Sequence, residues 1–155
     1  MQRVVSVIAL VGICFCLYAV WRHGHAREVR VVASWVRTPG VVNPDVRQAT
    51  IGQTICVQGW TRSVRPPTGY TSGLKLRQLR EYGLAGDPSG YQEDHLISLE
   101  LGGHPTDTRN LWPEPRPHAE EVDKIENELN ALVCSGKITL AEGRRRESSL
   151  KHRSG

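Results

Sequence analysis

Residues 4–20 form a nearly unbroken apolar run, and this run decides how much of the chain is left for a globular fold. Its 17 residues are long for the core of a signal peptide and short for a membrane span. Gly24 and Ala26 are small residues at positions −3 and −1 relative to a cleavage site after Ala26, which favours a cleaved signal peptide. Arg22 does not favour export of the flank, so an uncleaved anchor is the alternative and a buried core helix a third. Both leading interpretations place the rest of the chain outside the cytoplasm.

The remaining length suits one modest domain. We divide the chain into a signal peptide or membrane anchor (1–26), a polar linker with turn motifs (27–49), a globular domain (50–142) and a basic flexible tail (143–155). Outside the first 26 residues, 18 basic residues against 16 acidic residues leave a charge of +2. This excess is too small to indicate nucleic-acid binding by itself. We expect a monomer.

Two of the four cysteines lie in the targeting segment, which leaves Cys56 and Cys134 in the domain. Two cysteines in an exported domain favour a disulfide, and two separate buried thiols are the alternative. A bridge would close a long loop, which chain-entropy arithmetic values at about 4 kcal/mol.

Apolar spacing and turn residues predict an α+β fold. The most regular pattern is a helix over residues 118–133, with apolar residues at helical spacing and acids near its start. Trp112 is expected in the core, and Glu93 and Glu100 are expected to be solvated. The other expected elements are a short strand within 50–60, a helix over 71–82, a strand over 91–101, a turn at Gly102 and Gly103, a short strand around 110–112, and a short helix begun by a capping box at 139–142.

The order strand, turn, strand, helix carries a set of chemically useful residues. A phosphodiester hydrolase needs a cation, a general base for water, and a group that orients the base. Asp94 and His118 supply one oxygen and one nitrogen ligand, and two protein ligands leave room for water and phosphate. His95, on the other side of the strand from Asp94, is the candidate base. Asn110 is expected to clamp the loop and orient the His95 ring.

The residues YQEDHLISLELGGHPTDTRNLWPEP, followed by PHAEEVDKIENEL, resemble the HNH, or ββα-metal, nuclease superfamily. More narrowly, they resemble a bacterial group of small exported HNH-like proteins, with TIC, GWT and RP motifs before the core and VCSG after it. The resemblance covers roughly residues 38–142. It implies a small ββα-metal core preceded by a short strand and helix segment and by an N-terminal apolar helix. It also implies that Asp94 and His118 bind one divalent ion (Mg²⁺, Mn²⁺, Zn²⁺ or Ni²⁺), with His95 as base and Asn110 in support.

Two positions depart from the related pattern. Val122 stands where related sequences tend to carry lysine, and the tail after Glu142 does not follow the related sequences. We expect neither departure to touch the site residues.

The resulting hypothesis is a metal-dependent endonuclease of low sequence specificity, acting on DNA first and RNA second, and exported to the periplasm, the medium or the outer side of a membrane. The alternative is an inactive HNH-like module that binds nucleic acid or an envelope partner. An uncleaved N-terminal segment would add contact with a membrane. A basic group before the site favours either phosphate contact or a solvated helix face; it comprises Arg62, Arg65, Lys75, Arg77 and Arg80.

Overall fold

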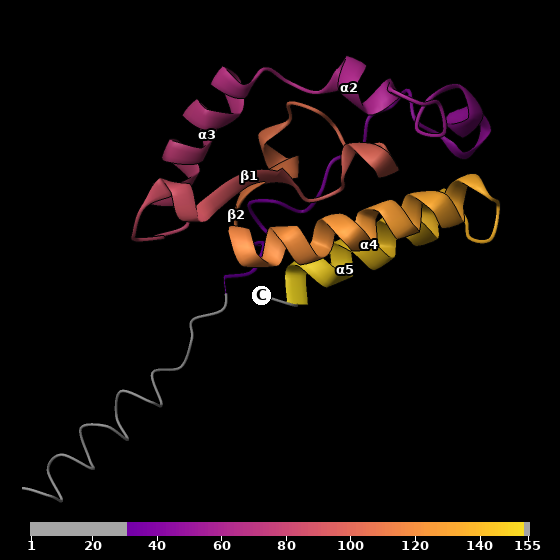
Figure 1. Cartoon of the computed structure of the whole chain (residues 1–155). Helices are drawn as coiled ribbons and strands as arrows, with labels where there is room; N and C mark the ends of the chain where they lie inside the picture. Colours follow the sequence, from indigo (N-terminus) through magenta and orange to yellow (C-terminus); the bar gives the residue numbers. More distant parts are fainter. Residues whose placement is uncertain (1–30, 154–155) are drawn as a thin grey trace, which may run out of the picture. The chain divides into compact units, whose positions relative to one another are not determined.

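A computed structural model describes residues 31–153, which combine α-helices with one antiparallel hairpin (Figure 1). The apolar run at residues 4–20, and with it the expected signal peptide, anchor or apolar helix, lies outside the described residues. Among residues 31–153, no helix is both long and apolar enough to cross a membrane. The fold is therefore mixed α and β, as the sequence predicts.

The hairpin pairs β1 (Tyr91–His95) with β2 (Leu111–Pro115). Asp94 lies opposite Trp112, which is fully buried as expected. The first strand is shorter than the predicted 91–101, because the residues after His95 are buried consecutively instead of alternating between two faces. The chain turns into the core there and forms the short 3-10 helix η3 (Leu99–Leu101).

Two glycines close the turn after η3. Gly102 has φ 72°, and a Cβ on Gly103 would lie 1.7 Å from the carbonyl oxygen of Ile97. Only glycine avoids both the left-handed strain and this clash. The chain then reaches the 3-10 helix η4 (Thr108–Asn110), which leads directly into β2.

The predicted helix over 118–133 is confirmed as α4 (Arg116–Cys134). Its buried residues repeat every three or four positions: Ala119, Val122, Glu126, Leu129 and Val133. The helix packs against both strands and against η3. One member of the buried row is a glutamate, which the expected apolar pattern did not include.

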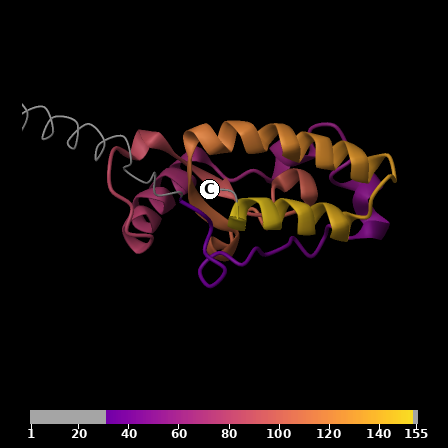
Figure 2. The same cartoon turned by 90° about the horizontal axis from the view of Figure 1, so that it is seen from below.

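The flexible tail expected at 143–155 is wrong over most of its length, because α5 (Leu140–Arg153) runs antiparallel beside α4 (Figure 2). The capping box at 139–142 does begin this helix: the Oγ1 of Thr139 accepts a hydrogen bond from the backbone N–H of Glu142 at 3.1 Å. Gly143 lets the two helices approach, since a Cβ there would lie 2.9 Å from Val133.

On the other side of the hairpin, α3 (Thr68–Glu81) contacts both strands, which confirms the helix predicted at 71–82 (Figure 1). The strand expected within 50–60 is wrong. Those residues form the 3-10 helix η1 (Gln48–Gln53), turns and the start of α2 (Trp60–Val64). Local backbone bonds replace a strand partner: the N–H groups of Thr54 and Cys56 both donate to the carbonyl of Ile51.

The described part of the expected linker, 31–49, has little regular structure but belongs to the packed unit. Ala33, Thr38 and Val46 are buried. Val42 forms an isolated bridge with Gly103. The linker is therefore not a free spacer over these residues.

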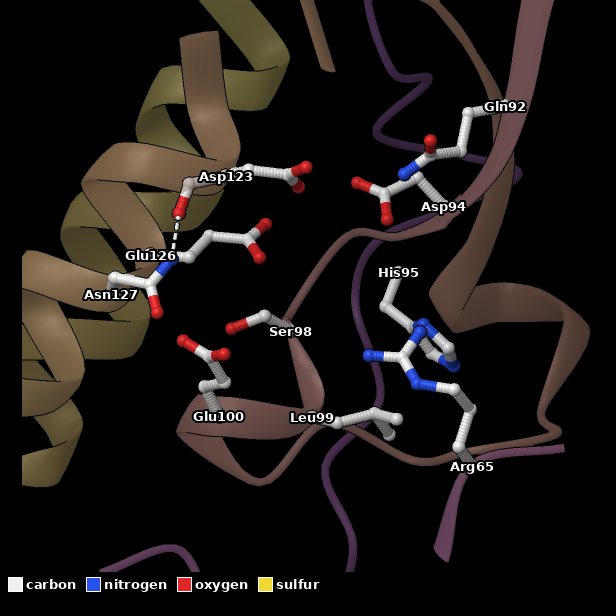
Figure 3. A pocket seen from close by; sticks show the side chains of 10 residues that line it. All are labelled: Arg65, Gln92, Asp94, His95, Ser98, Leu99, Glu100, Asp123, Glu126 and Asn127. Atoms are coloured by element: carbon white, nitrogen blue, oxygen red, sulfur yellow. Dashed lines mark hydrogen bonds between the residues drawn. The ribbon is translucent and has the colours of Figure 1, made fainter. Parts of the chain in front are cut away.

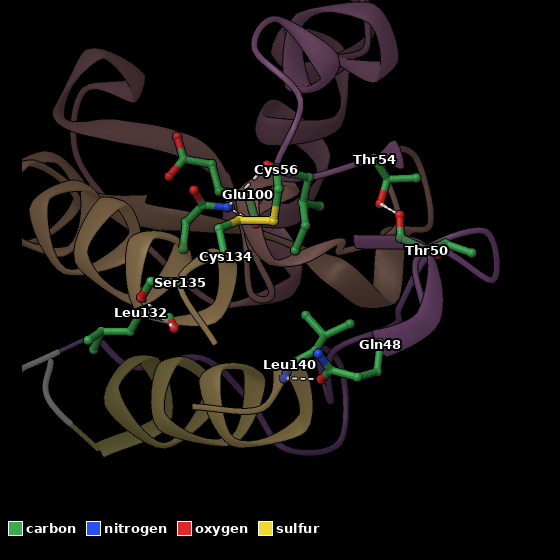
Figure 4. Close-up of a disulfide and its surroundings, with 11 residues drawn as sticks. Gln48, Thr50, Thr54, Cys56, Glu100, Leu132, Cys134, Ser135 and Leu140 are labelled. Atoms are coloured by element: carbon green, nitrogen blue, oxygen red, sulfur yellow. Dashed lines mark hydrogen bonds between the residues drawn. A yellow bond between two sulfur atoms is a disulfide. The ribbon is translucent and has the colours of Figure 1, made fainter. Parts of the chain in front are cut away.

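The disulfide between Cys56 and Cys134 is present, as predicted (Figure 4). It joins the segment before α2 to the last residue of α4, across a sequence separation of 78 residues. Beside it, Ile55 belongs to the main apolar cluster with Leu129 and Val133 of α4. The bridge therefore holds the irregular segment against the helix at a point where apolar packing also operates.

We predict that the double variant C56S/C134S unfolds with a free energy about 4 kcal/mol lower than the oxidised wild type, because its unfolded chain regains the freedom of the long loop. Urea unfolding with and without reductant measures this. Reductant should weaken the wild type and leave the variant unchanged. Equal stability of the oxidised wild type and the variant would contradict the prediction.

Candidate functional site

Asp94 and His95, at the end of β1, line one pocket of about 220 Å³ (Figure 3). Alternation along a strand would send the two side chains to opposite faces. Both side chains line the same pocket here, because β1 ends at His95 and strict alternation ends with it. Across it, Asp123, Glu126 and Asn127 of α4 face Asp94 (Figure 3).

The pocket is rich in carboxylates. Glu100 of η3 lines it together with Asp94, Asp123 and Glu126, while Arg65, after α2, is the one cationic side chain among its lining residues. Burial raises the pKa of Glu100 and of Asp123, and the nearby charge of Asp94 raises the pKa of Asp123 further. A site with these groups favours cations.

A buried lysine from α5 stands behind this pocket. The Nζ of Lys151 is 2.7 Å from Oδ2 of Asp94 and 2.6 Å from Oε1 of Glu126. The carboxylates of Glu114 and Glu147 lie slightly farther away, at 3.8 and 3.9 Å. Lys151 is 0% exposed, so its ammonium is stabilised by these neighbours and not by water.

The charge of the Lys151 ammonium, together with burial, determines which of the surrounding carboxyl groups ionise. Burial alone would lower the pKa of Lys151, but the surrounding carboxylates outweigh it and hold that pKa well above its ordinary value. Burial likewise opposes ionisation of Asp94, and the adjacent Lys151 keeps the pKa of Asp94 well below its usual range. Burial raises the pKa of Glu114 to about 10, that of Glu147 to about 7 and that of Glu126 well above normal. At neutral pH the cluster therefore combines the ammonium of Lys151 and an ionised Asp94 with glutamates whose ionisation burial opposes.

The His95 ring is fixed by the loop after the Gly-Gly turn. Its Nε2 lies 3.0 Å from the carbonyl oxygen of Pro105. A carbonyl only accepts hydrogen bonds, so Nε2 carries the hydrogen and Nδ1 is the acceptor of the neutral ring. Burial lowers the pKa of His95, which keeps the ring neutral at neutral pH.

Asn110 clamps the loop as expected, although it bonds to backbone and not to the His95 ring. Its Oδ1 accepts from the N–H of Ile97 at 3.0 Å, and its Nδ2 donates to the carbonyls of Ile97 and His104, each at 3.0 Å. His104 directly precedes Pro105, whose carbonyl holds His95. Asn110 therefore acts on His95 through the loop.

His118 is not among the residues that line the pocket. Its Nδ1 lies 2.5 Å from Oε1 of Glu114, and Glu114 in turn faces Lys151. The expected ligands Asp94 and His118 are thus connected through Glu114 and Lys151. The pocket itself brings Asp94 together with Glu126.

The ammonium of Lys151 bridges the carboxylates of Asp94 and Glu126, so this pair already holds one cation that belongs to the protein. Carboxylate oxygens suit Mg²⁺ and Mn²⁺ best. Within residues 31–153, no group of three or more His, Cys, Asp or Glu is arranged to hold a metal ion. Any ion here would therefore have few protein ligands and keep several waters.

The tail does touch the site, contrary to our expectation, because Lys151 belongs to it. Of the five basic residues considered for phosphate contact, Arg65 lines the pocket. The Nζ of Lys75 is used structurally, donating to the carbonyls of Pro88 and Tyr91 at 2.9 and 3.0 Å. Arg62, Arg77 and Arg80 are exposed and do not line the pocket.

Comparisons with protein-family models, with curated proteins and with solved structures gave no match to this chain. The chemical interpretation of the pocket rests on its own residues.

Glu93, one residue before Asp94, is not solvated as expected: both its carboxylate oxygens are buried without a hydrogen-bond partner. Burial raises the pKa of Glu93 to about 8, and the charge of Asp94 adds to this. The folded state therefore keeps a proton that the unfolded state releases near pH 4.5, so this group costs stability increasingly as the pH rises from about 4.5 to about 8.

We predict that E93Q gains stability relative to wild type between pH 5 and pH 8, by an amount on the order of 3 kcal/mol. Urea unfolding of both proteins at the two pH values measures this difference. The exposed Glu128 of α4 provides the matched control, and E128Q should show no comparable change. A constant difference between E93Q and wild type across this range would show that Glu93 is solvated.

Proposed function

We propose that this protein is a metal-dependent endonuclease of the HNH type that hydrolyses phosphodiester bonds of DNA, and RNA as a second substrate, outside the cytoplasm. The observation that carries the proposal is the convergence of a neutral, oriented His95 and a cation-binding carboxylate pair on one pocket. The hairpin followed by α4 supplies the order of elements that a ββα-metal core requires. The disulfide supports a location outside the cytoplasm, since such bonds persist in oxidising compartments.

His95 acts as the general base in this proposal. With Nε2 held by Pro105, Nδ1 is the atom that can take a proton from an attacking water. Asn110 keeps the loop in place, so the ring does not have to be oriented during the reaction.

Asp94 and Glu126 would hold a divalent cation, and Glu126 replaces His118 as the favoured partner of Asp94. When bound, such an ion supplies positive charge against the scissile phosphate and the leaving oxygen. Arg65, across the pocket, provides a donor for phosphate oxygens. The described residues contribute contacts suited to a backbone phosphate, which agrees with low sequence specificity.

We predict that H95A loses at least about 100-fold in plasmid nicking, because no other residue would take the proton from water. The assay uses Mg²⁺, Mn²⁺ and Zn²⁺ in turn, with a chelator as the blank. H95A should keep its melting temperature and its Mn²⁺ binding, which separates loss of the base from loss of the site. Nicking by H95A at the wild-type rate would refute the mechanism.

A matched pair of arginines tests the phosphate contact. We predict that R65A weakens DNA binding and lowers the slope of log affinity against log salt by about one, as expected for one lost phosphate contact. R62A removes the same charge from the exposed face of α2 and should leave the slope nearly unchanged. Equal effects of the two variants would assign only a general electrostatic role to Arg65.

The second candidate is a non-catalytic module that binds nucleic acid or an envelope partner. The ammonium of Lys151 favours it, because this group already neutralises Asp94. The nicking assay decides between the two: no cutting with any of the three ions, by a protein that binds DNA, would support the binding module.

A further inference from the structure

Lys151 has two sets of carboxylate partners that differ in their position relative to the pocket. The nearer pair, Asp94 and Glu126, lines the pocket, and each accepts a short hydrogen bond from Nζ. The farther pair, Glu114 and Glu147, does not line the pocket and is 0% exposed. Nζ thus lies between a front pair, Asp94 and Glu126, and a back pair, Glu114 and Glu147.

The back pair has unused hydrogen-bonding capacity. The Oε2 atoms of Glu114 and Glu147 are buried and have no hydrogen-bond partner. A buried oxygen without a donor is costly, so each is a ready acceptor for an ammonium that moves toward it. The lysine side chain has the freedom for such a movement, because its charge sits at the end of a flexible four-carbon stem. An ammonium that leaves the front pair would therefore still find acceptor oxygens on the back pair.

The pocket side also has polar capacity that is not used within the protein. Ser98 is buried, lines the pocket, and its Oγ makes no hydrogen bond. Oε2 of Glu100, another lining residue, is likewise buried without a donor (Figure 3). Together with the carboxylates of the front pair, these atoms offer oxygen donors to a hydrated cation.

We propose that Lys151 is a movable internal cation that competes with a divalent ion for Asp94 and Glu126, and that shifts toward Glu114 and Glu147 when the ion binds. This inference rests on the metal site of the proposed function. Because two cations cannot share the front pair at short range, ion affinity depends on how well the back pair receives the ammonium. Glu147 therefore affects ion binding although it does not line the pocket.

Mn²⁺ binding to the full chain tests this, followed by the loss of the free-ion signal in electron paramagnetic resonance. K151M removes the competitor and keeps the bulk of the stem, so we expect Mn²⁺ affinity to rise about tenfold or more. K124M removes a lysine from the exposed side of α4 and should change affinity no more than about twofold. Equal affinities of K151M and wild type would overturn the proposal.

E147Q tests the movement without removing Lys151, and it covers the case in which K151M does not fold. Glutamine keeps the oxygen that accepts from the backbone N–H of Ser98, at 2.8 Å from Oε1 in the native residue. It removes the charge that would receive the ammonium, so E147Q should bind Mn²⁺ more weakly than wild type by about threefold or more. Unchanged affinity in E147Q would overturn the movement.

In the double variant E147Q/K151M the effect of Glu147 should disappear, and the affinity should equal that of K151M. A purely structural role of Glu147 would instead weaken binding equally with and without Lys151, and this additive result would also overturn the proposal.

Nicking of DNA is measured separately from Mn²⁺ binding. Mn²⁺ binding with the expected pattern but without DNA cleavage would refute the nuclease and leave the role of Lys151 standing. Chelator-sensitive nicking with equal Mn²⁺ affinities in all variants would support the nuclease and refute the role of Lys151.

Discussion

The rest of the structure depends on one buried ammonium. Lys151 donates to Asp94 and to the backbone carbonyl of His95 at the end of β1, and to Glu126 of α4. These bonds link α5 to the hairpin and to its neighbouring helix. A buried charge is stable only while it has carboxylate partners, so the packing of α5 and the ionisation of the pocket are linked. The same contacts that fold the C-terminal helix therefore set the chemistry of Asp94.

Sequence patterns predicted elements whose burial follows a simple period. Helix α4 and the disulfide of Cys56 and Cys134 were found because apolar spacing and cysteine number are local signals. Residues 50–60 were misassigned because β-forming residues do not form a strand without a partner, and the hairpin is complete with two. The tail was misassigned because α5 buries Glu147 and Lys151, so its polar composition hides the face that packs.

The candidate site, like the fold, was predicted only in part. Asp94, His95 and Asn110 lie on the hairpin and its loop, and their spacing in the sequence indicated their shared location. The partners from the helices were missed, because pairing Glu126 with Lys151 requires knowing that α4 and α5 are antiparallel neighbours. One signal was available: Glu126 lies four residues after Val122 and three before Leu129, in the row of residues that the helix buries. A glutamate in such a row predicts a cation opposite.

Position 122 and the tail have different roles in this cluster, because they lie on different helices. Val122 is buried one turn before Glu126, on the face of α4 that turns toward the core. Position 122 is apolar, and the ammonium of the cluster comes from Lys151 of α5. The charge that balances Asp94 and Glu126 therefore comes from the neighbouring helix α5 and not from α4 itself.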